Sequence, residues 1–128
     1  MLESKAMLRA RILIVDDESS SIEIMRRYLT AKGHECDGAG DCDAARRSLE
    51  RKSYDLVLLD MILPDRTGFQ ALPELRRAGA ATILAMSGQT DDDTRRDAML
   101  LGADGFLPKP LDLPALCALI DSLPEKSG

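Results

Sequence analysis

The chain has 128 residues and a formal net charge of −5, with 45% hydrophobic and 30% charged residues. This length suits a single domain with its own core, and the composition is that of an ordinary globular protein. The net negative charge argues against DNA or RNA as a direct partner, because such binding depends on clustered Lys and Arg. No apolar stretch approaches the ~20 residues that a membrane span requires. The sequence therefore predicts a soluble domain that neither binds nucleic acid nor enters a membrane.

Cysteine usage favours a reducing compartment. Cys36, Cys42 and Cys117 form no CxxC pair and, being three, cannot all be joined in disulfides. Because no signal-peptide pattern precedes them, we expect free thiols and a cytoplasmic location. Residues 1–10 show no clear periodicity and are expected to be a loose lead-in, and residues 124–128 form a short polar tail. The domain itself is predicted to span the residues between these two segments.

Five short strands are predicted to alternate with five amphipathic helices. In chain order, the predicted strands are 11–15, 35–39, 55–60, 81–86 and 104–108. The predicted helices between and after them are 19–32, 42–52, 67–78, 90–102 and 113–123. Continuous apolar runs in the first, third and fourth strands indicate strands covered on both faces, whereas the polar second strand fits a sheet edge. We therefore predict a doubly wound α/β fold, a five-stranded parallel sheet between two helix layers.

Charged and polar residues stand where four of these strands end. Asp16 and Asp17 follow the first strand, Asp60 closes the third, and Ser87 and Lys109 follow the fourth and fifth. In open parallel sheets the carboxyl ends of the strands form the ligand-binding edge. Residues that are scattered along the sequence are thus expected to meet at one site.

The acids at this edge suit a hard divalent cation such as Mg²⁺, which prefers oxygen ligands. Asp17 and Asp60 can each supply a carboxylate oxygen, and the backbone carbonyl of Met61 can add a third protein ligand. Asp16 is placed to act through a bound water. Since like charges this close repel one another, a divalent ion should relieve the strain of the empty site.

Asp60 is the predicted nucleophile, because a carboxylate can form an acyl phosphate. Lys109 and the hydroxyl of Ser87 would neutralise the oxygens of the transferring phosphoryl group. A metal and a phosphoryl group are thus expected to meet at the end of the third strand.

Four sequence motifs make the chain resemble the receiver domain of two-component response regulators, the fold of the chemotaxis signalling protein. They are VDDE at 15–18, LLDMILP at 58–64 with Gly68, MSG at 86–88, and GADGFLPKP at 102–110. The resemblance covers residues 11–123 and implies a flavodoxin-like strand order, 2-1-3-4-5. It also implies a Mg²⁺-dependent phosphoprotein of a phosphorelay. Asp60 would receive a phosphoryl group from a sensor histidine kinase or a histidine phosphotransfer protein.

The resemblance assigns further roles. Asp16, Asp17, Asp60 and Met61 would hold Mg²⁺, and Lys109 would contact the phosphoryl oxygens. The residues expected to act in switching and turnover are these: Ser87 and Phe106 as switch residues, Lys109–Pro110 as a cis peptide bond, and Ile62 and Gln89 as tuners of dephosphorylation. The surface of 90–123 would carry the change to a downstream protein target. Such domains are monomers or phosphorylation-dependent dimers.

Other interpretations are weaker. A haloacid-dehalogenase-like phosphatase would carry a second Asp two residues after the nucleophile, where this chain has Ile62. A degenerate receiver that only docks a partner would not need all five site residues. The expected function is therefore a signalling switch that catalyses only its own phosphorylation and dephosphorylation. The sole histidine, His34, is expected at the surface beside the polar strand, which argues against a phosphohistidine relay within the chain.

The extent of the whole protein is a separate question. We expect a single-domain regulator, because the chain starts with Met1 and nothing beyond the last helix is left for an output module. The alternative is a receiver domain excised from a longer multidomain regulator or hybrid kinase.

Overall fold

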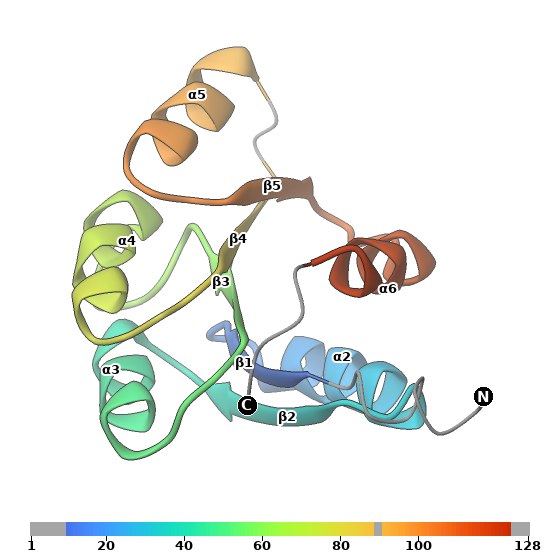
Figure 1. Cartoon of the computed structure of the whole chain (residues 1–128). Coiled ribbons are helices and arrows are strands. Elements are labelled where there is room, and N and C mark those ends of the chain that lie inside the picture. The colour runs from blue at the N-terminus through green and yellow to red at the C-terminus, as the bar shows by residue number, and fades with distance from the viewer. Residues whose placement is uncertain (1–9, 89–90, 124–128) are drawn as a thin grey trace.

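The structure, a computed structural model, describes residues 10–88 and 91–123, which alternate strands with helices (Figure 1). The strands are β1 (Arg11–Val15), β2 (Glu35–Ala39), β3 (Leu56–Asp60), β4 (Ile83–Ser87) and β5 (Gly105–Pro108). The helices are α2 (Ser19–Ala31), α3 (Cys42–Arg51), α4 (Gly68–Arg77), α5 (Asp92–Leu100) and α6 (Leu113–Asp121).

The five strands form one sheet in the order β2-β1-β3-β4-β5, and every neighbouring pair is parallel. This confirms the predicted fold class and strand order. The apolar strands β1, β3 and β4 occupy the centre, where both faces of a parallel sheet are covered. The more polar β2 lies at an edge, as its sequence predicts.

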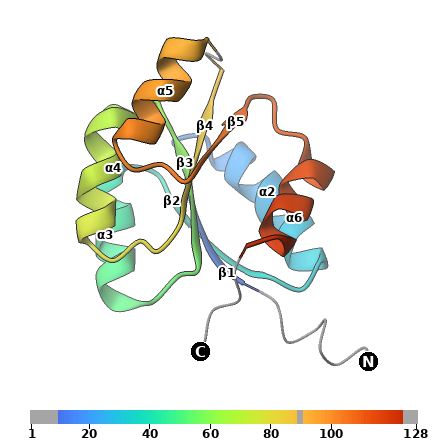
Figure 2. The ribbon, with the colours of Figure 1, turned by 45° about the horizontal axis from the view of Figure 1, so that its top comes forward.

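Helices cover both faces of the sheet. In Figure 2, α3, α4 and α5 lie on one side of the strands and α2 and α6 on the other. Each layer encloses its own apolar core. Leu13, Val57 and Leu59 point towards α3 and α4, whereas Ile14 and Leu58 point towards α2 and α6. Successive strand residues thus alternate between the two cores, as the period of two requires.

The helix boundaries differ from the predicted ones by one or two residues because capping residues lie just outside the helices. Thr67 precedes α4 and forms a capping box with Gln70. Asp91 precedes α5 and accepts a hydrogen bond from the Thr94 amide at 2.8 Å. The expected start of that helix, Thr90, lies outside the described residues. No helix in the described ranges is long and apolar enough to span a membrane.

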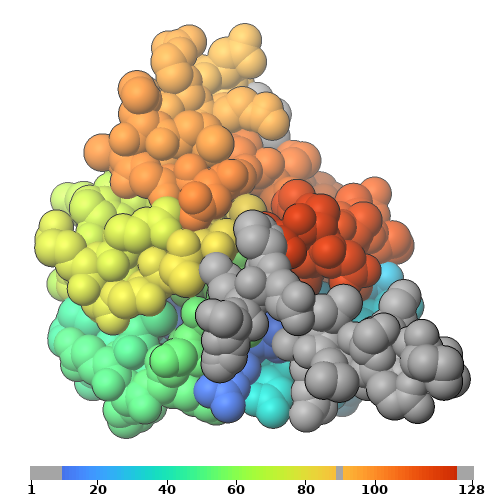
Figure 3. All heavy atoms as spheres, in the orientation of Figure 1, coloured from blue at the N-terminus to red at the C-terminus, as the bar shows by residue number. Residues whose placement is uncertain are grey.

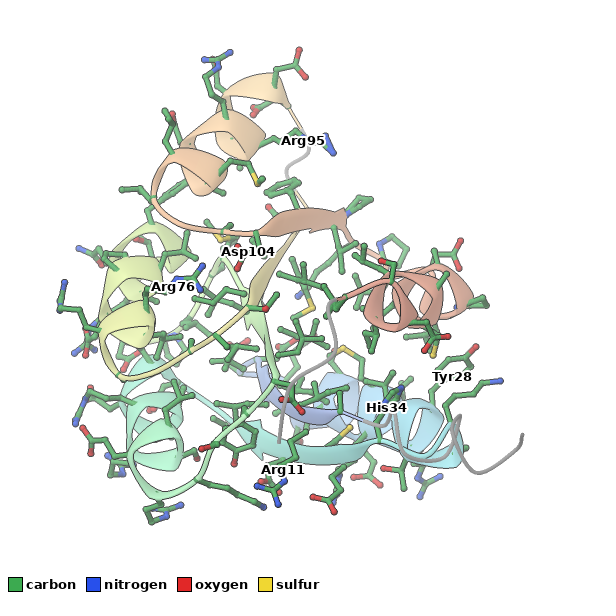
Figure 4. All side chains as sticks on the ribbon, in the orientation of Figure 1. Arg11, Tyr28, His34, Arg76, Arg95 and Asp104 are labelled. Atoms are coloured by element: carbon green, nitrogen blue, oxygen red, sulfur yellow. The ribbon has the colours of Figure 1, made fainter. Side chains whose placement is uncertain are left out.

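An arginine fastens the amino-terminal edge of the sheet, opposite the strand ends that carry the acids. Figure 4 shows Arg76 of α4 reaching towards Asp104, which precedes β5. Arg76 pairs with the Asp104 carboxylate at 2.8 Å and also donates to the backbone carbonyls of Ala81 and Gly102. The same Asp104 carboxylate accepts the amide of Ile83 at 2.9 Å. These contacts tie α4 to the beginnings of β4 and β5.

The prediction that His34 lies at the surface is wrong. Only 6% of the residue is exposed, and its Nδ1 accepts a hydrogen bond from the amide of Ala10 at 2.9 Å. Figure 4 shows the ring beside the end of α2. Burial lowers the pKa of His34 below its usual 6.5, although the nearby Asp121 carboxylate raises it in part. The fold therefore favours the neutral imidazole, whose Nδ1 can accept the Ala10 amide.

This burial predicts a loss of stability in mild acid. Because the pKa of His34 is lower in the folded state, the unfolded chain binds its proton first as the pH falls below about 6.5. The free energy of unfolding should therefore fall between pH 7.5 and pH 5.5. Urea unfolding at both pH values measures this. His34→Gln keeps an acceptor but does not titrate, and the chain has 1 histidine. An equal fall in wild type and His34→Gln would contradict the prediction.

Candidate functional site

The carboxyl ends of four strands bring the predicted site residues together. Asp16 directly follows β1, Asp60 is the last residue of β3, and Ser87 is the last residue of β4. Lys109 directly follows β5, and its backbone amide donates to the Ser87 carbonyl at 2.8 Å. Since β1, β3, β4 and β5 are successive strands of the sheet, their ends lie at one edge.

Three acids form a compact cluster at this edge. One carboxylate oxygen from each of Asp16, Asp17 and Asp60 lies within 4.8 Å of the other two. Asp16 is 0% exposed and Asp60 is 6% exposed, while Asp17 faces solvent. An oxygen-only ligand set with an open side is what Mg²⁺ requires, because this ion retains several waters.

Lys109 is the cation that the structure places against these acids. Its Nζ lies 2.9 Å from Asp60 Oδ2 and 3.5 Å from Asp16 Oδ2. Burial alone would lower the pKa of Lys109, but the hydrogen bond and charge of Asp60, and then those of Asp16, raise it above its usual value. The lysine therefore stays charged and offsets part of the repulsion between the two buried carboxylates.

Burial makes the ionised form of Asp16 costly. Burial raises its pKa, and the charge of Asp60 adds to this rise. A hydrogen bond from the Glu18 amide at 3.0 Å and the charge of Lys109 lower the pKa only in part. The ionised cluster is thus incompletely compensated by the protein groups around it. Such a site gains from a bound divalent cation.

The chain turns back immediately after Asp60. The Ile62 amide donates to Asp60 Oδ1 at 3.0 Å, and an isolated bridge pairs Ile62 with Thr67. The Met61 carbonyl, the expected metal ligand, accepts the amide of Gly68 at 2.7 Å. Met61 is buried, whereas Ile62 is 70% exposed above the site. Gln89, the other residue expected to tune dephosphorylation, lies outside the described residues.

The expected switch residue Phe106 is half-buried on β5 and packs against the core beneath α3, α4 and α5. The guanidinium of Arg95 on α5 lies 5.9 Å from the centre of its ring, a distance at which a cation–π contact is favourable. Figure 4 labels Arg95 beside α5. The Lys109–Pro110 peptide bond is cis, the isomer that the resemblance implies.

A groove that the sequence does not indicate lies beside the acid cluster. It has a volume of about 420 Å³ and runs from Asp16 and Asp17 along α2, where Ile22 and Arg26 line it. These two residues are separated by four positions on a helix, so they face the same side. The sequence shows this spacing, but it does not show that this face of the helix is turned towards the acids.

Because Lys109 pairs with two buried acids, we expect Lys109→Met to have a lower free energy of unfolding than wild type. Removing one partner of a fully buried pair costs about 3–5 kcal/mol. We expect roughly 1–3 kcal/mol here, because the Lys109 side chain is 30% exposed and solvent screens it. The loss should be larger at pH 7.5 than at pH 4.5, because the already raised pKa of Asp16 would rise further and favour the protonated folded state in acid.

Urea unfolding in EDTA at both pH values measures this loss. Lys52→Met is the matched control, since Lys52 pairs with the half-exposed Asp37 at 3.0 Å and precedes the end of β3 that is opposite Asp60. If Lys109→Met lowers the free energy of unfolding equally at both pH values, the charge of Lys109 is not what stabilises the buried acids.

Comparison with known proteins places this geometry in a family. A family model described as "Response regulator receiver domain" matches residues 12–121. The transcriptional activator protein IrlR of Burkholderia pseudomallei is 35% identical over 113 residues, which are 88% of this chain and 49% of IrlR. The chain spans about half the length of the curated relatives it matches.

Solved structures agree with this match. A two-component response regulator from Clostridium difficile superposes with a TM-score of 0.86 at 29% identity, covering 89% of this chain and 94% of that one. A response regulator receiver protein from Pseudomonas putida gives a TM-score of 0.82 at 30% identity, covering 90% and 98%. The chain belongs to the response regulator receiver domain family of two-component signalling proteins.

Proposed function

We propose that Asp60 accepts a phosphoryl group from the phosphohistidine of a sensor histidine kinase or a histidine phosphotransfer protein. The observation that carries this proposal is the position of Asp60, held 2.9 Å from Lys109 and within 4.8 Å of Asp16 and Asp17. Receiver domains of this family are signalling switches that are phosphorylated on Asp and bind Mg²⁺. Of the two acids that Lys109 contacts, Asp60 is the nearer, at 2.9 Å against 3.5 Å for Asp16.

In the proposed step, a carboxylate oxygen of Asp60 attacks phosphorus, and the new P–O bond forms as the P–N bond to the donor imidazole breaks. The bonding electrons return to the imidazole nitrogen, and the ring leaves as neutral imidazole because the other ring nitrogen of the donor phosphohistidine carries a proton. Lys109 then contacts the phosphoryl oxygens instead of the bare carboxylate, so that its charge balances the charge of the transferred group. Mg²⁺, when bound, would supply the remaining positive charge.

Asp16, Asp17 and Asp60 would hold this ion, since each offers an oxygen at the cluster. The backbone ligand is better assigned to Ile62 than to Met61. In the bridge between Ile62 and Thr67, the flanking residues make the hydrogen bonds, from Gly68 to Met61 and from Leu63 to Arg66. The carbonyl of Ile62 therefore points away from Thr67, on the same side as its amide, which donates to Asp60.

Ser87 and Phe106 are the proposed switch residues. Ser87 is 5% exposed and ends β4 beside the Lys109 backbone, so that a phosphoryl group on Asp60 would lie within reach of its hydroxyl after a small rotation. Phe106 would then turn inward into the space that Ser87 leaves. The surface of 90–123 would carry this change to a downstream protein, as a monomer or through dimerisation.

Turnover of the aspartyl phosphate would be tuned at Ile62 and Gln89. The apolar side chain of Ile62 cannot orient an attacking water, whereas the amide of Gln89 could. The three free cysteines fit a reducing cytoplasm. We propose that the module acts on a separate target. In a longer regulator that contains this domain, the same surface would act on an attached module.

Phosphoryl uptake should depend on Asp60. Incubation with acetyl phosphate and Mg²⁺ should give a single phosphoryl adduct by intact mass spectrometry, and EDTA should abolish it. Asp60→Asn should fold but give no adduct, because the amide lacks a nucleophilic oxygen. Asp97→Asn, on the exposed face of α5, is the matched control and should label like wild type. Labelling of Asp60→Asn at the wild-type level would overturn the assignment.

Mg²⁺ should stabilise the fold through the acid cluster. At a concentration of 100 times the dissociation constant, a ligand specific for the folded state adds about 2.7 kcal/mol to the free energy of unfolding. We expect this gain for wild type and Asp97→Asn in chemical unfolding, and a much smaller gain for Asp17→Asn. A wild-type protein whose stability does not respond to Mg²⁺ would favour a domain that only docks a partner.

A further inference from the structure

The loop of residues 61–67 carries the backbone groups that directly follow Asp60. It leaves β3, turns back through the Ile62–Thr67 bridge and enters α4. The Ile62 amide holds Asp60 Oδ1 at 3.0 Å. Whatever holds this loop in place therefore also positions the acceptor carboxylate and the proposed backbone ligand of the metal.

The first tether of the loop is Asp65. One carboxylate oxygen accepts the backbone amide of Cys42 at 3.1 Å, and the other accepts that of Asp43 at 3.2 Å. These are the first two residues of α3, whose N-cap is Asp41. The Asp65 side chain thus fixes the loop to the amino-terminal end of a neighbouring helix, where an anion is favourable.

The second tether is Arg66. Its Nε lies 2.9 Å from Glu74 on α4, its Nη2 lies 3.0 Å from Asp43 on α3, and its Nη1 lies 3.1 Å from Asp65. The side chain of Arg66 is 29% exposed, and those of Asp65 and Glu74 are 24% and 21% exposed. A planar fork can bridge three carboxylates at once, and a lysine ammonium cannot match this geometry.

Figure 3 shows α3 and α4 stacked side by side on one flank of the molecule, so that one side chain can reach both helices. We propose that Asp65 and Arg66 are positioning residues for Asp60 phosphorylation: they hold the 61–67 loop against α3 and α4 with its backbone groups preset for metal and phosphoryl binding. This inference rests on the proposed function of Asp60.

The consequence is a specific change in metal affinity. Without Arg66, the loop must be ordered when the ion binds, and that cost appears as weaker binding. Loss of an outer contact that orients metal ligands typically weakens binding about 10- to 100-fold, and we expect about 10-fold for Arg66→Ala. The phosphorylation rate at saturating Mg²⁺ should stay within about twofold of wild type, because the bound ion restores the loop.

The test is a Mg²⁺ titration of the unphosphorylated protein, followed by backbone amide NMR shifts. Arg46→Ala is the matched control, because Arg46 pairs with the same Asp43 and Glu74 but lies outside the loop. Arg66→Ala should raise the dissociation constant about 10-fold. It should also speed hydrogen exchange at the Ile62 amide, and Arg46→Ala should change neither quantity.

Equal Mg²⁺ affinity and Ile62 exchange in wild type and Arg66→Ala would overturn the inference, as would an equal loss in Arg46→Ala. Arg66→Lys and Asp65→Asn keep the size of the side chains and serve if Arg66→Ala does not fold. Both should weaken Mg²⁺ binding less than Arg66→Ala, and unchanged binding in both would also count against the tethers. A wild-type protein that binds no Mg²⁺ would instead refute the proposed function, whatever the variants do.

Discussion

The structure depends on how two buried carboxylates are tolerated at the end of a parallel sheet. Asp16 and Asp60 lie where apolar strands end, and Lys109 is the side chain that the structure sets between them. A buried ion pair adds little net stability, because desolvation offsets most of the attraction. Here a single lysine faces two acids, so the compensation is partial. A site of this kind is held by the surrounding fold and responds strongly to any added charge.

The fold could be predicted because its signals are local. The continuous apolar runs that become β1, β3 and β4 can be buried only with helices on both faces, and the polar run of β2 tolerates an edge. His34 could not be placed in this way. Its burial depends on the amide of Ala10, 24 residues earlier, which needs an acceptor. No periodicity in the sequence reports a hydrogen bond between such distant positions.

The residues of the site likewise divide into those that local sequence signals predict and those that depend on contacts between distant residues. Asp16, Asp60 and Lys109 were predictable because the carboxyl ends of parallel strands must share one edge. Asp65 and Arg66 were not, because their partners on α3 stand 22 or 23 residues earlier in the chain. Met61 and Ile62, the two candidates for the backbone ligand, are adjacent in the chain. Successive residues of an extended segment point in opposite directions, so an error of one residue reverses the carbonyl.

Two elements of the surface that would transmit the signal, α5 and β5, contain few buried residues. Each of β3 and β4 has five residues, and all of them are buried. No residue of β5 is buried, and in α5 only Ala98 is. Segments with few buried contacts are the ones that rearrange at the lowest free energy. The acids thus stand at the buried centre of the sheet, while the β5 edge has fewer buried residues. If Asp60 is phosphorylated as proposed, the added charge would act first on this edge, which is joined to Asp60 through Ser87 and Lys109.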